Sequence, residues 1–399
     1  MISRRAALAG GFAVGAASGL SKARAISAKR VKIGNTMPYS GPASTYGVIG
    51  RTETAFFAMV NEQGGVAGHT IDFISLDDGY SPPKTVEQIR RLVEEDQVDF
   101  TFQTLGTPCN SAIADYLNHK KIPHLFVGSG ASKWADVKRY PWTMGFQPGY
   151  RTEAQIYAKH MLENVKDPKL AILYQNDDFG KDYPLGVRDI LGSDWDRIVV
   201  KSTSYETTDP TIDSQIVEMQ SSGANVLLVA AIPKFAAQSI RKVYDSNWKP
   251  TFYMTNVAIS VGGVMTPAGP EKAVGMLSTA YLKDPTEPAF KDDPGMQQWR
   301  EFMAKYMPAG DVTDLSYVFA YAVSLTMRQV LEQCKGDFSR ENVMTQAESL
   351  HNLELPVLLP GIKVSTSRTD HRPSTSMQFM KWDGKTWARF GDLITGATV

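Results

Sequence analysis

Short apolar runs alternate with amphipathic segments along most of the chain. In the segment 45–62, for example, three- and four-residue spacing as on the buried face of a helix separates Ile49, Thr52, Phe56, Met59 and Val60. Buried strands that alternate with such helices predict a parallel, doubly wound α/β sheet. The strand-like runs of the first half lie at residues 31–37, 71–76, 98–102 and 122–127.

The same alternation repeats with a second set of elements, so we predict two α/β lobes with six or more parallel strands each. The predicted strands of the second set lie at residues 170–174, 198–202, 226–231 and 251–254. The tail has a different pattern, because its short runs alternate polar and apolar residues around the turn at 383–385. Small antiparallel strands are expected there, at residues 361–365, 376–382 and 387–390.

The first 25 residues have the composition of an export signal. A twin-arginine pair, Arg4 and Arg5, precedes a weakly apolar stretch rich in Ala and Gly that ends in the cleavage pattern A-x-A at Ala25. We predict export to the periplasm with cleavage after Ala25. Ala7 replaces the bulky residue usual in twin-arginine signals, so the general secretory route stays open. Beyond this segment no run of about 18 uncharged apolar residues occurs.

Charge and motifs restrict the function classes. The chain has 42 basic and 42 acidic residues, and loss of a signal with four basic residues leaves a net charge of −4, which disfavours nucleic-acid binding. The six histidines show no metal-binding spacing, and no nucleotide-binding or nucleophile motif is complete. We therefore expect a protein without cofactor or metal that is not an enzyme. Whether Cys109 and Cys334 pair stays open.

Two glycine-containing turns follow predicted strands, where open α/β sheets bind ligands. They are LGTPC at 105–109 and GSGAS at 128–132. Thr107-Pro108 predicts a helix start, with Thr107 as N-cap and Pro108 as the first helical residue. The free N–H groups of a helix start favour an anion. Two such turns side by side would hold a carboxylate through N–H and O–H groups, without an arginine.

The sequence resembles a known receptor family through five motifs in matching order. They are SGPASTYG at 40–47, NEQGGVAGHTIDFISLDD at 61–78, the GTP turn at 106–108, GSGAS at 128–132 and DDFGKDY at 177–183. Together they resemble the periplasmic leucine/isoleucine/valine-binding proteins and the wider family of hydrophobic-amino-acid receptors of ABC transporters. The resemblance covers nearly all of the chain after residue 25.

The resemblance implies a type I periplasmic binding fold whose two lobes close on a small ligand. Three crossovers would join the lobes near residues 146–150, 275–280 and 352–359. The expected lobes are residues 26–148 plus 279–353 and residues 149–278 plus 354–399. The closed form would deliver its ligand to an ABC permease and ATPase in the inner membrane.

The resemblance also implies roles for individual residues. Thr107 would contact the ligand carboxylate through its hydroxyl and N–H, and Ala131 and Ser132 would add a carbonyl and a second hydroxyl. Tyr46 would line the cleft from one lobe and Phe179 from the other. The full set of expected ligand-binding residues is Tyr46, Leu105, Gly106, Thr107, Ser129, Gly130, Ala131, Ser132, Tyr150, Phe179, Ile232 and Asn256.

One departure from the family pattern bears on the ligand. Leucine-binding members place an acidic residue after the strand near Met254, but here TNVAIS brings Asn256 or Val257 to that position. An ammonium group desolvated without a carboxylate is unfavourable by several kcal/mol. We therefore hypothesise a carboxylate ligand without an ammonium, such as an aromatic acid. A branched-chain or other hydrophobic amino acid stays open, because Asp177 or Asp178 could supply the negative charge.

Two alternative functions stay open at this point. The first is a ligand-sensing regulator with the same two lobes and no transport role. The second is a periplasmic serine hydrolase that uses Ser129 or Ser132, which is disfavoured because no motif places a base. The family's early disulfide is absent, since Tyr80 and Gly106 stand at its two positions.

Overall fold

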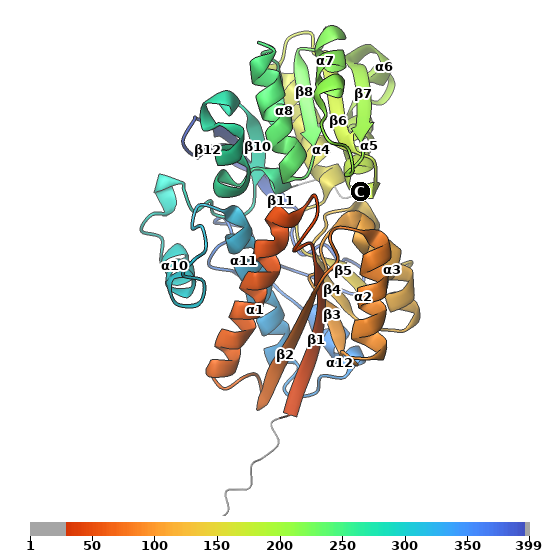
Figure 1. The fold of residues 1–399 in the computed structure, drawn as a ribbon, viewed down its shortest axis with the longest axis vertical. Coiled ribbons are helices and arrows are strands. Elements are labelled where there is room, and N and C mark those ends of the chain that lie inside the picture. Colours follow the sequence, from red (N-terminus) through yellow and green to blue (C-terminus); the bar gives the residue numbers. More distant parts are fainter. Residues whose placement is uncertain (1–28, 396–399) are drawn as a thin grey trace, which may run out of the picture.

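A computed structural model describes residues 29–395, so the export signal and its cleavage after Ala25 lie outside the described residues. The chain forms two α/β lobes stacked end to end (Figure 1). Lobe 1 contains a five-stranded sheet, and lobe 2 contains a seven-stranded sheet. None of the helices in residues 29–395 combines the length and apolarity that a membrane-crossing segment needs.

The sheet of lobe 1 is parallel throughout, with the strand order β2-β1-β3-β4-β5. Helix α1 and helix α11 lie together on one face, while α2 and α3 lie on the other (Figure 1). Buried aliphatic residues such as Ile89, Ile113 and Leu117 fill the space beneath α2 and α3. The bounds are β1 Lys29–Met37, β2 His69–Asp77, β3 Phe100–Phe102, β4 His124–Val127, β5 Thr143–Gly145, α1 Gly47–Glu62, α2 Pro82–Glu94, α3 Thr107–His119 and α11 Leu315–Gln333.

The sheet of lobe 2 has the strand order β12-β11-β10-β9-β8-β6-β7. Strands β6 to β10 are parallel, whereas β11 and β12 run antiparallel at one edge. The strands are β6 Leu170–Gln175, β7 Val199–Tyr205, β8 Val226–Ala230, β9 Thr251–Met254, β10 Leu277–Ala280, β11 Ser376–Trp382 and β12 Trp387–Thr395. The helices are α4 Tyr150–Asn164, α5 Asp178–Leu191, α6 Trp195–Ile198, α7 Asp213–Ser221, α8 Pro233–Asp245 and α9 Thr266–Ala268.

The chain passes between the lobes three times. It leaves lobe 1 after β5, returns after β10, and enters lobe 2 again before β11. The middle passage leads to α10 (Pro294–Tyr306), α11 and α12 (Arg340–Ala347), and both α10 and α11 pack against α1 of lobe 1. The two sheets therefore belong to separate lobes that are joined by three chain segments.

The predicted two-lobed α/β fold with antiparallel strands near the C-terminus is confirmed. The predicted number of six or more parallel strands per lobe is wrong, because each described sheet has five parallel strands. The expected strand at 361–365 is also wrong. Only Val364 pairs there, in an isolated bridge with Leu353, because β11 already occupies the edge of β10.

The seam between α1 and α11 gives a first testable prediction. Phe56 is fully buried, and its ring centroid lies 5.6 Å from that of Tyr321 and 6.0 Å from that of Phe302. Phe56→Ala should lower the free energy of unfolding by about 3–5 kcal/mol in urea, because a cavity replaces the ring. Leu185→Ala is the control, since Leu185 is 46% exposed. A loss below about 1 kcal/mol for Phe56→Ala would contradict the packing described here.

Candidate functional site

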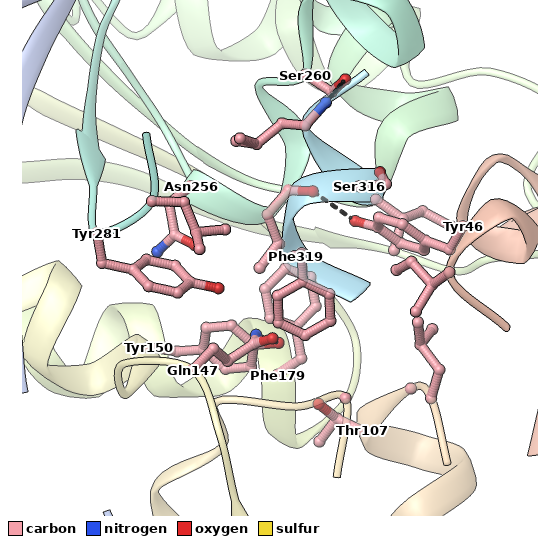
Figure 2. Close-up of a pocket in the computed structure, with 18 of the residues that line it drawn as sticks. Tyr46, Thr107, Gln147, Tyr150, Phe179, Asn256, Ser260, Tyr281, Ser316 and Phe319 are labelled. Carbon is pink, nitrogen blue, oxygen red and sulfur yellow. Dashed lines mark hydrogen bonds between the residues drawn. The ribbon is translucent and has the colours of Figure 1, made fainter. Parts of the chain in front are cut away.

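A cavity of about 720 Å³ lies between the lobes, at the ends of strands from both sheets. Aromatic rings form much of its wall (Figure 2). No Asp, Glu, Lys, Arg or His from residues 29–395 lines it. Its aromatic lining consists of Tyr46, Tyr80, Tyr150, Phe179, Tyr281 and Phe319, and its polar side chains are those of Thr107, Gln147, Asn256, Ser260 and Ser316.

The lobe 1 side of the cavity is built around the start of α3. Gly106 has a φ of +104°, and a Cβ atom there would lie 2.5 Å from the Tyr80 ring, so only glycine fits without a shift. Gly106 rather than Thr107 is the N-cap, and Thr107 is the first helical residue. The prediction that Thr107 caps the helix is therefore wrong. Its hydroxyl lies 2.6 Å from Ser129 Oγ instead.

The first turn of α3 leaves donors free. In the part of the chain that the structure describes, the amides of Thr107 and Cys109 donate to no backbone carbonyl. Pro108 between them has no N–H. A helix start with unpaired N–H groups beside a cavity favours a negatively charged ligand group.

The lobe 2 side consists of residues that begin helices or follow strands. Tyr150 starts α4, and its hydroxyl accepts a hydrogen bond of 2.8 Å from Gln147 Nε2. Phe179 lies in the first turn of α5, with its ring centroid 4.7 Å from that of Tyr150. Asn256 follows β9 and Tyr281 follows β10. Figure 2 shows the Tyr281 hydroxyl directed into the cavity, across from Thr107.

Neither aspartate that the sequence offered as an ammonium partner lines the cavity. Asp177 is the N-cap of α5, where its Oδ1 accepts from the Gly180 amide at 3.1 Å. Burial raises the pKa of Asp177 to about 6. Asp178 points to lobe 1, where its carboxylate lies 2.9 Å from Lys133 Nζ. Both carboxylates thus have protein partners.

The turn at 129–132 lies away from the main cavity and lines a second one of about 470 Å³. Ser132 donates from its amide and its hydroxyl to the two carboxylate oxygens of Asp182 in lobe 2, each at 2.7 Å. The Ala131 carbonyl accepts from the Trp134 amide at 3.1 Å. The hydroxyl of Ser132 that the family resemblance directs to the ligand is therefore bonded to a carboxylate of the protein instead.

Direct contacts join the lobes around the main cavity. The Tyr46 hydroxyl donates to the Val257 carbonyl at 2.8 Å, the bond that Figure 2 draws. The Lys133–Asp178 and Ser132–Asp182 contacts join the lobes beside the second cavity. The described arrangement is thus one in which the cleft is closed.

Eight of the twelve expected ligand-binding residues line the main cavity, and four line the second one instead. The eight are Tyr46, Leu105, Gly106, Thr107, Tyr150, Phe179, Ile232 and Asn256, and the four are Ser129, Gly130, Ala131 and Ser132. Among the lining residues that the sequence did not predict, Tyr281 directly follows a strand. The expectation that ligands bind in the loops after strands therefore applied to Tyr281 as well. Phe319 lies inside α11, where the helical pattern alone gives no sign of a ligand.

The structure gives no support to hydrolysis by the two serines. Ser129 Oγ is shared by the Thr107 hydroxyl and by Trp134 Nε1, which donates at 2.9 Å. Within residues 29–395, no histidine bonds to the hydroxyl of Ser129 or Ser132, and no three side chains are grouped to hold a metal ion. Cys109 and Cys334 are both buried and free, so they do not pair.

Buried polar groups beneath α3 fix the start of the helix. Asn110 donates to the Thr104 carbonyl at 2.9 Å, and the Thr104 hydroxyl lies 2.6 Å from both Asn110 Oδ1 and His124 Nε2. All three residues are fully buried. Desolvation of the charged imidazolium lowers the pKa of His124 to about 3.

Comparisons with known proteins give consistent results. The family model described as "Periplasmic binding protein" matches residues 30–386. The chain is 24% identical to Leu/Ile/Val-binding protein homolog 7 of Brucella suis over 378 residues, which cover 89% of this chain and 90% of the relative.

Two solved structures share the fold. A branched-chain amino acid ABC transporter protein from Thermus thermophilus with bound valine is similar at a TM-score of 0.81 and 15% identity, covering 92% of this chain and 97% of the other. A fatty acid ABC transporter substrate-binding protein from Thermomonospora curvata is similar at a TM-score of 0.77 and 19% identity, covering 92% and 93%.

The buried histidine predicts a specific pH dependence. His124 titrates near pH 6.5 when unfolded and near 3 when folded, so the unfolded chain binds the additional proton between these values. The contribution of His124 to the stability should fall as the pH decreases below 6.5, by about 2–3 kcal/mol at pH 4.5. Urea unfolding of wild type and His124→Asn across pH 4.5–7.5 measures this difference in slope. His119→Asn, at an exposed position, should keep the wild-type slope. Parallel curves for wild type and His124→Asn would contradict the prediction.

Proposed function

Because the chain belongs to the periplasmic binding protein family, we propose that it is an exported substrate-binding protein of an ABC importer that captures a small hydrophobic carboxylate. An aromatic acid is the ligand we favour. The observation that supports this choice is a closed, uncharged and largely aromatic cavity with the free N–H groups of a helix start at one side.

The aromatic wall suits a flat apolar body. Tyr150 and Phe179 meet edge to face, at an interplanar angle of 60°, and Tyr281 and Phe319 line the same cavity. Burial of a benzene-sized ring of roughly 130 Å² contributes about 3 kcal/mol at the usual area coefficient. An aliphatic group of a ligand would also gain binding free energy from burial against this surface. A preference for an aromatic ligand therefore depends on the shape of the cavity and on edge-to-face contacts with its rings.

The carboxylate of the ligand would lie at the start of α3. The Thr107 hydroxyl and amide are neutral donors at the cavity wall, and a hydrogen bond to a charged group contributes about 1.5–3 kcal/mol. An α-ammonium group would find no acidic side chain among the residues that line this cavity. A cavity that offers donors to a carboxylate and no acidic partner to an ammonium group favours an acid over an amino acid.

The relatives leave the ligand open, because proteins with this fold take different ligands. The printed names of the two similar structures mention valine and fatty acid. At identities below 20%, these likenesses support the fold alone. The lining residues of this chain therefore carry the argument for its own ligand.

Transport requires that ligand binding changes the shape of the receptor. In this proposal the lobes, residues 26–148 plus 279–353 and residues 149–278 plus 354–399, rotate about their three connections. A ligand that touches both lobes shifts the equilibrium to the closed form, which the membrane permease recognises. The signal would be removed after Ala25 on export.

Thr107 provides the first test of the ligand class. Thr107→Val removes the hydroxyl and should weaken carboxylates about 10- to 100-fold, because one charge-assisted hydrogen bond is lost. Isothermal titration of aromatic acids, chosen by a thermal-shift screen that includes leucine and valine, measures the effect. Thr208→Val, at an exposed site outside the cavity, should bind like wild type. Stabilisation by leucine or valine and by no aromatic acid would refute the ligand class.

Asp182 provides a test of closure that leaves the main cavity untouched. Asp182→Ala removes both bonds from Ser132 and should populate the open form. Since only the closed fraction binds tightly, the affinity for every ligand should fall by one common factor, roughly 3- to 30-fold. Small-angle scattering without ligand should show a larger radius of gyration than for wild type. A ligand-dependent factor would mean that Asp182 acts on the ligand rather than on closure.

A further inference from the structure

A small annex of about 250 Å³ adjoins the main cavity on the lobe 2 side. The two share Asn256, Tyr281, Leu282 and Leu315 in their walls. The annex additionally contains Asp284, which follows β10 by four residues. Asp284 is thus an acidic side chain of the annex that does not line the main cavity.

The annex contains two buried polar atoms without a partner. Asn256 Nδ2 donates no hydrogen bond, and Asp284 Oδ2 accepts none, within the described part of the chain. The residues are 7% and 4% exposed. Unsatisfied groups at such burial are unfavourable by about 1–3 kcal/mol each, so their presence on one wall points to a partner that arrives from outside the chain.

Both residues are anchored through their other atoms. The Asn256 amide donates to Glu153 Oε1 at 2.9 Å. Asp284 Oδ1 accepts from the amide of Thr286 at 2.8 Å and from its hydroxyl at 2.6 Å. The Asp284 carboxylate is therefore held in place before a ligand binds, and Asn256 is held through its backbone.

The two orphan atoms define the chemistry of the group that matches them. A hydroxyl accepts from Asn256 Nδ2 with its lone pair and donates its hydrogen to Asp284 Oδ2. An ammonium group would satisfy Asp284 and leave the Asn256 donor unmatched. A carboxylate would be repelled by Asp284, since no lysine or arginine lines the annex.

Asp284 remains an acceptor near neutral pH although its surroundings raise its pKa. Burial raises its pKa to about 6, and the nearby carboxylates of Glu287 and Asp314 act in the same direction. Glu287 is itself paired with Arg389 at 2.9 Å, and Asp314 accepts from the Ser260 hydroxyl at 2.6 Å. At pH 7 to 8 the Asp284 carboxyl is thus mainly ionised.

We propose that the annex binds a hydroxyl group of the ligand, at the end opposite its carboxylate. This inference rests on the proposed function, which places the carboxylate at Thr107 in lobe 1. Figure 2 shows Thr107 and Asn256 on opposite sides of the cavity, with the aromatic rings between them. The preferred ligand class is then a hydroxylated aromatic acid.

Matched pairs of acids test the proposal at pH 7.5 by isothermal titration. Benzoate, phenylacetate and cinnamate are each compared with the 4-hydroxy compound, which spans three distances between carboxylate and hydroxyl. The hydroxyl should tighten binding at least 10-fold in the pair of fitting length. A 4-aminomethyl compound of the same length should bind more weakly than the hydroxyl compound.

Variants then assign the preference to the annex. Asp284→Asn should abolish the hydroxyl preference while changing the affinity for the unsubstituted acid by less than about 3-fold. Asn256→Ala should abolish the same preference, and only the ratio within each pair of acids is read for this variant because Asn256 also lines the main cavity. Asp292→Asn, an exposed carboxylate on the same loop, is the control and should keep the preference. If either variant fails to fold, the wild-type pairs still decide the hydroxyl preference, and the other variant assigns it.

The outcomes separate the two proposals. Equal binding of both members of every pair would overturn the annex proposal and leave the proposed function standing. Tighter binding of the aminomethyl compound would show a cation site instead and would also overturn it. Binding of no acid of either series would overturn the proposed function and the annex proposal together.

Discussion

One buried carboxylate, that of Glu153, holds together the part of lobe 2 that faces the ligand. Glu153 is fully buried, and its oxygens accept from the Tyr157 and Tyr183 hydroxyls, from Thr279 Oγ1 at 2.7 Å and from the Asn256 amide at 2.9 Å. A carboxylate at this burial is tolerable only because several donors surround it. The donors come from α4, α5, β10 and the loop after β9, so one charge fixes four separate segments.

The ligand-facing residues are neighbours of these donors in the chain. Phe179 lies one helical turn before Tyr183, and Tyr281 lies two residues after Thr279. In lobe 1 the start of α3 has its own support, the buried bonds among Thr104, Asn110 and His124. Each half of the site is therefore held in place by bonds within its own lobe. Closure needs only to bring the cavity wall of lobe 1 against that of lobe 2.

The sequence predicts the parts of the site that follow strands, because the carboxyl ends of parallel strands meet at one edge of each sheet. Thr107 and Asn256 were found in this way, and both line the cavity. The turn at 129–132 has the same glycine and hydroxyl content, yet its donors face Asp182 of the other lobe. Phe319 enters the cavity from the middle of a helix. Contacts between segments distant in the sequence determine the positions of the turn at 129–132 and of Phe319. Local sequence patterns do not predict such contacts.

Among residues 29–395, no ionised side chain lines the main cavity, and this sets a limit on the ligand. Closure removes the ligand from water, and each unmatched charge on it would then be unfavourable by several kcal/mol. Asp177 and Asp182 do not relieve this, since Asp177 caps α5 and Asp182 is bonded to Ser132. A single negative charge has matching donors at α3, whereas a second negative charge has none among the lining residues. Selectivity in this receptor thus arises as much from the charges that it cannot pair as from the apolar surface that it offers.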